Sequence, residues 1–201
     1  MSKVIFSLAM SVDGYMGGAG EQALPVHNRL LGWVHDLASW RRAAGLEGGL
    51  ANRDDDVIKE QAARVGAHVM GRLMFDRGEE PWGDNPPFQA SVFILTNQAR
   101  ETVAKAGGTT YTFVTDGIAS AIAQAKAAAG EKDVRVEGGA NAVQQAIRAG
   151  QVDEFDLQLI PVLLGGGIRP FDHIGAGQIE LEPTRVIDSP KLTHPRYHVV
   201  K

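Results

Sequence analysis

Cysteine is absent from this chain of 201 residues, which excludes disulfide bonds, thiolate nucleophiles and zinc sites built on sulfur. Aromatic residues make up only 6% of the chain, and no segment approaches the roughly 18 consecutive apolar residues that a membrane helix needs. The N-terminal segment lacks the apolar core and the cleavage-type end of a signal peptide. We therefore expect a cytoplasmic protein with no membrane partner.

An excess of positive charge is also lacking. The formal net charge is −4, and Lys and Arg form no basic stripe, so nucleic acid is not an expected partner. The six histidines show no H-E-x-x-H or comparable spacing, and we predict no metal. A G-x-S-x-G elbow, typical of many hydrolases, is missing too. What remains is the composition of an ordinary globular protein, with 44% apolar and 22% charged residues.

Short apolar, β-branched runs alternate with segments of helical spacing over most of the chain. Strands are expected at residues 3–10, 67–70, 91–95, 111–114, 134–137 and 156–160, followed by an antiparallel pair at 179–187 and 196–200. Helices are expected at residues 28–42, 53–65, 118–129 and 140–149, with another starting at residue 72. This alternation is typical of parallel strands joined by crossover helices, within one domain over residues 1–201.

The junction of Gly138 and Gly139 with the following helix resembles a phosphate-binding turn. Glycine lets a phosphate approach the main chain, and a helix start offers unpaired N–H groups and a positive dipole end. The alternative is a tight turn that requires a positive φ. The full G-x-G-x-x-G fingerprint and the Walker A loop are both absent.

Other strand ends strengthen the phosphate interpretation. Gly71 and Arg72 follow one predicted strand, and the guanidinium is well shaped to hold a phosphate. Leu95 and Thr96 end the next strand with a hydroxyl group. Separately, Arg72 reads as a surface charge and Thr96 as a helix cap. If the strands are parallel, these ends share one edge, where ligands bind in such sheets. Together they indicate a groove for an extended phosphate-bearing ligand.

The order of these motifs resembles the dihydrofolate reductase-like superfamily. It is most similar to the reductase domain of the riboflavin-pathway deaminase–reductases, in a stand-alone form. The segments that carry the resemblance are Ser11-Val12-Asp13-Gly14, Met70-Gly71-Arg72, Ile94-Leu95-Thr96, Gly138-Gly139, Val152-Asp153-Glu154 and Pro161-Val162-Leu163-Leu164-Gly165-Gly166-Gly167. The resemblance covers nearly the whole chain.

The resemblance implies a three-layer α/β/α sandwich with a mixed, mostly parallel sheet, NADPH as cofactor and a homodimer. Main-chain groups at the nicotinamide would come from Ala9, Met10, Met16 and Gly17. The pyrophosphate would lie on Gly138, Gly139, Ala140 and Asn141. Further cofactor contacts would come from Gly71, Arg72, Leu95 and Thr96, with Arg72 and Thr96 towards the adenosine phosphate. Glu137 matches a carboxylate that contacts the substrate in these reductases.

The activity that the resemblance implies is NADPH-dependent hydride transfer to a C=N or C=O group of a small heterocyclic substrate. The reductase of 5-amino-6-(5-phosphoribosylamino)uracil is one such type, and dihydrofolate reductase is another. Dihydrofolate is disfavoured as the substrate, because the first helix lacks the acidic side chain of dihydrofolate reductases. The alternative is a non-catalytic NADP-binding regulatory protein, which would suit the missing acid and Met74 in place of the threonine of the MGRxT motif.

Two assignments stay open at this point. Asp13 is either a proton source near the nicotinamide or the first residue of a turn with Gly14, and we favour the turn. Trp33 and Trp40 either belong to an ordinary amphipathic helix or form a wall against a flat substrate, and the helix is the favoured interpretation.

Overall fold

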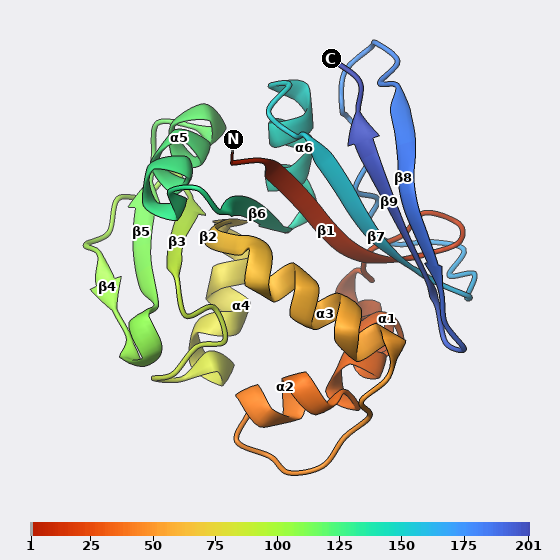
Figure 1. Cartoon of the computed structure of the whole chain (residues 1–201). Helices are drawn as coiled ribbons and strands as arrows, with labels where there is room; N and C mark the ends of the chain where they lie inside the picture. The colour runs from red at the N-terminus through yellow and green to blue at the C-terminus, as the bar shows by residue number, and fades with distance from the viewer. Residues whose placement is uncertain (1) are drawn as a thin grey trace.

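The computed structural model describes residues 2–201 and is built on a nine-stranded sheet with the order β4-β5-β3-β2-β6-β1-β7-β9-β8 (Figure 1). Six adjacent strands, β5-β3-β2-β6-β1-β7, run parallel. At one edge β4 is antiparallel to β5, and on the other side β9 is antiparallel to both β7 and β8. The strands are β1 (Val4–Ser11), β2 (Val65–Gly71), β3 (Ser91–Leu95), β4 (Val103–Ala104), β5 (Thr110–Val114), β6 (Asp133–Gly138), β7 (Glu154–Ile160), β8 (Leu181–Asp188) and β9 (Thr193–Val199).

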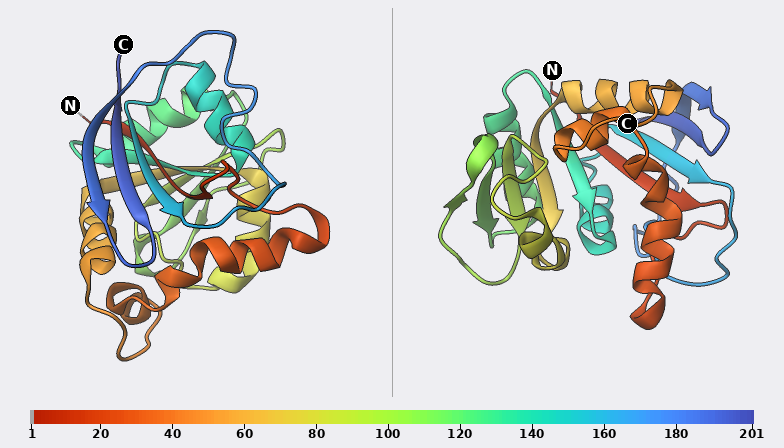
Figure 2. Two further views of the ribbon diagram at one scale, coloured as in Figure 1. Left: turned by 90° about the vertical axis from the view of Figure 1, so that its right-hand side faces the viewer. Right: turned by 90° about the horizontal axis from the view of Figure 1, so that it is seen from below.

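Helices cover both faces of this sheet, which confirms the predicted three-layer sandwich (Figures 1 and 2). One face carries α5 (Ile118–Ala129) and α6 (Ala140–Arg148), and the other carries α1 (Ala23–His35), α2 (Ala38–Ala43), α3 (Arg53–Arg64) and α4 (Arg72–Trp82). Two short 3₁₀ turns, η1 (Gly20–Gln22) and η2 (Ala106–Gly108), lie in loops. No helix among residues 2–201 is both long and apolar enough to span a bilayer.

Several predicted boundaries were wrong; β7 begins at Glu154, not at residue 156, and β9 begins at Thr193, not at residue 196. The helix expected at residues 28–42 is two helices, because Leu37 is extended (φ −76°, ψ 142°) and its side chain is buried between them. The first of these helices also begins earlier, at Ala23. The two-residue strand β4 was not predicted, since so short an edge strand leaves no periodic pattern.

Alternation along β6 separates the two faces of the sheet. Val134 and Val136 are fully buried in the core formed with α5 and α6. Arg135 and Glu137 alternate with them and therefore point to the face that carries α1, α3 and α4. On that face a core around Trp33 packs under α1, and a second core around Phe75 packs under α4.

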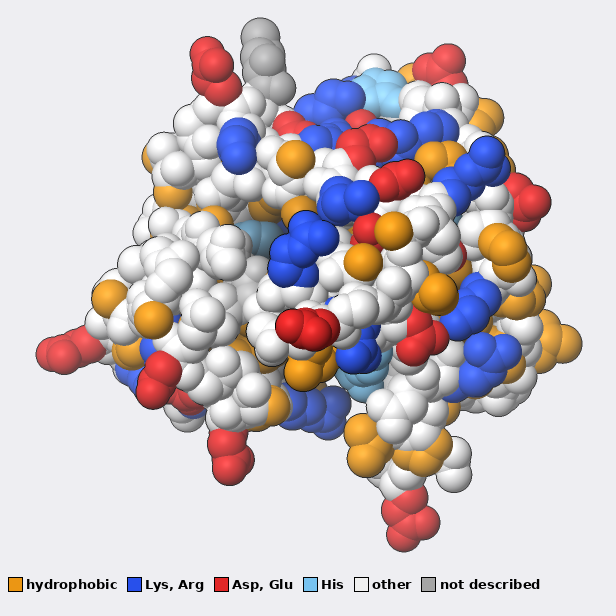
Figure 3. All heavy atoms as spheres, turned by 60° about the horizontal axis from the view of Figure 1, so that its bottom comes forward, with side chains coloured by type: hydrophobic (Ala, Val, Ile, Leu, Met, Phe, Trp, Pro, Cys, Tyr) orange, Lys and Arg blue, Asp and Glu red, His pale blue; other side chains and the backbone are white. Residues whose placement is uncertain are grey.

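Between these cores the sheet face is polar and is covered by α3. Arg64 lies 2.8 Å from Asp133 and 2.6 Å from Glu154, and Arg196 lies 2.7 Å from Asp156. Figure 3 shows charged side chains of both signs gathered over the upper part of this view. Because burying an unpaired charge is costly, these partners restrict how α3 can lie on the sheet.

The first turn of α3 carries a buried aspartate that is hydrogen-bonded to a histidine. Asp54 is 2% exposed and lies 2.8 Å from Nε2 of His194 in β9, which is 1% exposed. The aspartates at residues 54–56 were expected to favour the helix dipole. Asp54 is also the hydrogen-bond partner of the buried imidazole of His194.

We predict that Asp54→Ala lowers the free energy of unfolding by about 1–3 kcal/mol, because it leaves His194 without its hydrogen-bond partner. Urea unfolding at neutral pH measures this change. Asp56→Ala is the matched control, since the Asp56 side chain is 75% exposed and pairs with Lys59, which is also partly exposed. It should cost at most about 1 kcal/mol. Equal losses in both variants would show that the buried pair contributes nothing.

Candidate active site

The two glycines after β6 have different physical roles. Gly138 has φ +115°, which only glycine adopts without strain, so the tight-turn interpretation holds for this residue. Gly139 has φ −41° and needs no glycine for its backbone. A Cβ atom built on Gly139 would meet no atom within 4 Å. Open space therefore lies directly in front of its main chain.

A second helix starts beside this junction. Met70 lies opposite Gly138 in the pairing of β2 with β6, and Gly71 begins α4 as Gly139 begins α6. A Cβ atom on Gly71 would lie 3.9 Å from the main-chain nitrogen of Gly139. Neither helix start is capped by a side chain. The N–H groups of two first turns are therefore left for an anion or for water at one edge.

The other predicted cofactor residues lie along the same edge. Ala9 and Met10 lie near the end of β1, Gly71 is the last residue of β2 and Arg72 the first of α4, and Thr96 follows β3. These strands and β6 are consecutive in the order β3-β2-β6-β1, so their ends span three inter-strand spacings, about 14 Å. In the view from below, the end of β6 and the start of α6 lie between α1 and α4 (Figure 2, right).

Two polar side chains on this edge already have local partners. Nε of Arg72 lies 2.6 Å from Asp76, one turn further along α4, and the side chain is 33% exposed. Thr96 is buried, and its hydroxyl accepts a hydrogen bond from the N–H of Gln98 at 3.1 Å. The bond to Asp76 uses one of the five N–H donors of Arg72, and the Thr96 hydroxyl still has its own proton to donate.

The loop after β1 is held in place by Asp13. Its carboxylate accepts hydrogen bonds from the N–H groups of Leu164 (3.1 Å) and Gly165 (2.8 Å) in the loop after β7. The Ser11 hydroxyl and the N–H groups of Gly165 and Leu164 lower the pKa of Asp13 to about 2. Asp13 is thus ionised at neutral pH and has no proton to donate. Gly14, with φ +88°, completes the turn that we favoured from the sequence.

The same two loops also pair through their main chains. Met16 donates to the carbonyl of Ile168 at 2.8 Å, and Ile168 donates to the carbonyl of Gly17 at 2.8 Å. A Cβ atom on Gly167 would lie 2.3 Å from the Gly17 carbonyl oxygen, so this contact requires glycine. The methyl group of Met16 would lie 3.7 Å from a Cβ on Gly138. The loop after β1 is thereby placed against the end of β6.

Glu137 lies one residue before Gly138 and is paired on two sides. Its Oε1 lies 2.6 Å from Nε of Arg135 and 2.5 Å from Nδ1 of His68 in β2. Burial alone would raise the pKa of Glu137, but Arg135 and His68 outweigh it and lower that pKa to about 2. Sequence reasoning missed His68, because one histidine in an apolar strand belongs to no motif.

The two tryptophans pack against histidine rings. Trp33 is 8% exposed, and its ring packs edge-on against His194 at 5.7 Å between centroids. Trp40 is half-buried with its ring centroid 4.6 Å from that of His35. The amphipathic-helix interpretation is therefore correct for Trp33.

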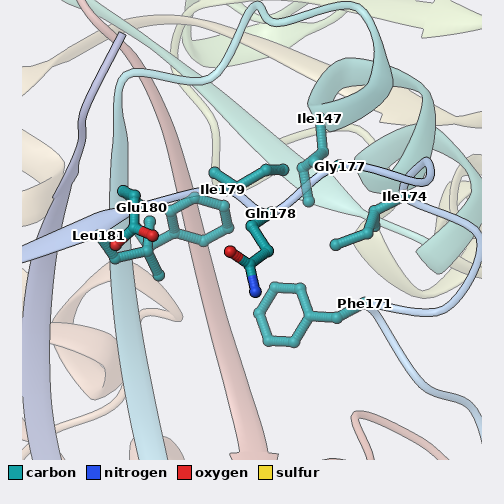
Figure 4. A pocket seen from close by; sticks show the side chains of 9 residues that line it. Ile147, Phe171, Ile174, Gly177, Gln178, Ile179, Glu180 and Leu181 are labelled. Carbon is teal, nitrogen blue, oxygen red and sulfur yellow. The ribbon is translucent and has the colours of Figure 1, made fainter.

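An apolar hollow of about 470 Å³ lies elsewhere, on the face that carries α6. Figure 4 shows Ile147, Phe171 and Ile174 around it. It includes none of the residues predicted to bind cofactor or substrate, and it lacks the charged groups that a phosphate needs.

A family model described as the RibD C-terminal domain matches residues 2–193. No curated protein sequence matches the chain. A solved structure from Shewanella sp. PV-4, named for riboflavin biosynthesis, superposes with a TM-score of 0.71 at 24% identity and covers 100% of both chains.

Two further solved structures share the fold. One is a diaminohydroxyphosphoribosylaminopyrimidine deaminase/5-amino-6-(5-phosphoribosylamino)uracil reductase from Thermotoga maritima, with a TM-score of 0.60 at 13% identity. The match covers 99% of this chain and 57% of that one. The other is dihydrofolate reductase from Enterococcus faecalis in complex with NADP(H), with a TM-score of 0.55 at 15% identity and coverage of 99% and 97%.

We predict that Asp13→Ala increases hydrogen exchange at the amides of Leu164 and Gly165, because both lose their acceptor. Exchange mass spectrometry of the loop after β7 measures this. In the unchanged chain, the stabilisation from Asp13 is present above about pH 4, where the unfolded carboxyl is also ionised, and is lost as the pH falls towards 2. Asp116→Ala, at the end of β5, is the control. Unchanged protection in Asp13→Ala would rule out the proposed tie between the loops.

Proposed function

The chain belongs to the RibD C-terminal domain family, and we propose that it is an NADPH-dependent reductase. Its reaction would be hydride transfer to a C=N or C=O group of a small heterocyclic substrate. 5-Amino-6-(5-phosphoribosylamino)uracil is the first substrate to test, because the Thermotoga maritima structure is named as its reductase.

The observation that carries the proposal is the pair of uncapped helix starts at Gly71 and Gly139. A pyrophosphate is an anion, and two adjacent first turns offer it N–H donors and two positive dipole ends. The empty space in front of Gly139 fits a close approach of phosphate oxygens to the main chain. We propose that Gly138, Gly139, Ala140 and Asn141 hold the pyrophosphate.

We assign the remaining cofactor-binding residues from the position of each strand along the edge. Arg72 and Thr96, beyond α6, would hold the adenosine phosphate end, with Gly71 and Leu95 supplying main-chain contacts. On the other side, Ala9, Met10, Met16 and Gly17 would flank the nicotinamide. A bound reduced nicotinamide supplies the hydride, while the protein positions the reacting groups and excludes water. The tie from Asp13 to the loop after β7 would keep Met16 and Gly17 in place.

We propose that residues 1–201 form one domain, since β1 lies in the middle of the sheet and the C-terminal strands β8 and β9 extend the same sheet. The homodimer and the cytoplasmic location that we expected from the sequence stay predictions. Light scattering of the purified protein checks the first of them.

We predict that Gly139→Val weakens NADPH binding at least tenfold, because its side chain would occupy the space proposed for the phosphates. Titration of NADPH fluorescence with the protein measures the dissociation constant. Gly177→Val is the matched control, because a Cβ atom there also meets nothing within 4 Å, but the residue lines the apolar hollow beside Ile147. Normal NADPH binding by Gly139→Val would contradict the phosphate assignment.

We also predict that Arg72→Gln weakens NADPH binding by about tenfold to a hundredfold and leaves NADH binding nearly unchanged. The reason is the loss of a charge-assisted hydrogen bond to the 2′-phosphate, worth about 1.5–3 kcal/mol. Parallel titrations with both nucleotides measure the selectivity. Asp76→Asn is the partner variant, since it frees Arg72 and should not weaken NADPH binding. Equal losses for both nucleotides in Arg72→Gln would contradict the assignment of Arg72.

Binding of NADPH without turnover of any substrate would favour the alternative function, a non-catalytic regulatory protein.

A further inference from the structure

His68 of β2 and Glu137 of β6 lie side by side on the sheet face that carries α1, α3 and α4. His68 faces Arg135 in the pairing of β2 with β6, and its neighbours Ala67 and Val69 are buried in the opposite core. Glu137 directly precedes the glycine turn at the cofactor edge. The two side chains are therefore next to the place where a substrate must lie to meet a nicotinamide held at that edge.

The surroundings of His68 leave one of its nitrogens free. The side chain of His68 is 7% exposed, and Nδ1 is bonded to Glu137. The ring of Phe88 packs against the imidazole at 5.2 Å between centroids. Among residues 2–201, Glu137 is the only ionisable group that hydrogen-bonds to His68, and Arg135 pairs with the same carboxylate oxygen. Within those residues Nε2 has no hydrogen-bond partner.

The two carboxylates near the cofactor edge cannot supply a proton. The Ser11 hydroxyl and the N–H groups of Gly165 and Leu164 lower the pKa of Asp13 to about 2. Arg135 and His68 overcome the effect of burial and lower the pKa of Glu137 to about 2. Both groups are ionised at neutral pH. A carboxylate held against Nδ1 orients an imidazole and stabilises its protonated form, as in other acid–base pairs of this kind.

We propose that His68 is the proton donor of the reductase reaction and that Glu137 is a positioning residue that acts through it. This proposal rests on the proposed function and deepens it, because it moves Glu137 from direct substrate contact to the support of His68. Arg135 in turn keeps Glu137 ionised and in place.

The substrate carbon gains the hydride and a new C–H bond, and the π electrons of the C=O or C=N bond move to the heteroatom. The heteroatom takes the proton from Nε2 of His68, whose N–H bond breaks. The substrate is reduced, the nicotinamide is oxidised, and neutral His68 regains a proton from water. Glu137 stays ionised throughout.

A second buried pair of histidine and carboxylate serves as the control for a purely structural role of His68 and Glu137. His194 and Asp54 also form a buried pair of histidine and carboxylate. This pair bridges β9 and α3, and β9 lies four inter-strand spacings from β2, about 19 Å. The same substitution at both histidines therefore separates loss of a buried hydrogen bond from loss of a proton donor.

The first test compares His68→Asn with the unchanged chain, using NADPH and 5-amino-6-(5-phosphoribosylamino)uracil. Asparagine keeps an amide near the position of Nδ1 but cannot donate a catalytic proton. We expect kcat to fall by about 10²–10⁴-fold, the usual contribution of general acid catalysis, with NADPH binding changed by less than about twofold. His194→Asn should lower stability and leave kcat and its pH profile unchanged.

Glu137→Gln is the second variant and keeps the size of the side chain. We expect the loss of activity at high pH to begin at a lower pH, because the imidazolium loses the negative charge that retains its proton. His68→Asn should lack this pH dependence altogether. The pH dependence of kcat separates this from a structural role, which would change stability without moving the profile.

The third readout does not depend on turnover. Nitrogen NMR of the histidine side chains, in a complex with oxidised NADP and the same uracil compound, should show the Nε2 signal of His68 shifting on binding while Nδ1 keeps its proton. A silent Nε2 signal, or a normal kcat in His68→Asn, would overturn the proton-donor role alone. Absence of both binding and turnover in the unchanged chain would overturn the proposed function, and this inference with it.

Discussion

The parallel pairing of β6 with its two neighbours is the constraint on which the rest of the site depends. Parallel strands end at one edge of a sheet, and here β6 lies between β1 and β2. Because Met70 is opposite Gly138, the helices α4 and α6 begin next to each other. Their first N–H groups have no partner within the helix and no side-chain cap. An edge of this kind must stay open to water or to an anion.

The glycines along this edge show why one residue type can serve two purposes. Gly138 and Gly167 are required by the protein itself, one by its positive φ and the other by the close approach of Gly17. Gly139 is required by neither, and the space before it is open. A glycine with no internal reason is the stronger indicator of a ligand, because its missing side chain matters only when something else approaches.

The sheet face under α3 carries polar side chains that are buried and paired. Glu154, Asp156 and Gln158 alternate along β7, a pattern typical of a strand that faces water. All three are buried. Arg64 of α3 pairs with Glu154, Arg196 of β9 pairs with Asp156, and the Gln158 amide donates to the Ser7 hydroxyl. Buried charges with defined partners tolerate few arrangements, so they orient the elements as well as any apolar contact does. The pair of His68 and Glu137 lies on the same polar face, closer to the open edge.

The sequence by itself determined the local elements and the order of the motifs. Helix α5 and strand β3 lie where they were predicted, at residues 118–129 and 91–95, because periodicity and glycine stops are local properties. The terminal antiparallel pair was also predicted correctly in kind. The strand-end motifs could be placed on one edge from the parallel topology alone. The identity of the ligand at that edge was inferred from the family resemblance. Glycines and one arginine indicate that an anion binds there, but they do not specify which anion.

Only the tertiary structure decided which side chains meet. Glu137 and His68 are 69 residues apart and become partners through the pairing of β2 with β6, while Asp54 and His194 are 140 residues apart. No local pattern encodes such contacts, because a single histidine in a strand reads the same whether it lies in a core or beside a carboxylate. The tertiary structure likewise ended α1 before Leu37 and turned Asp13 into a tie between two loops. These outcomes depend on neighbours distant in the chain, which only the folded sheet brings together.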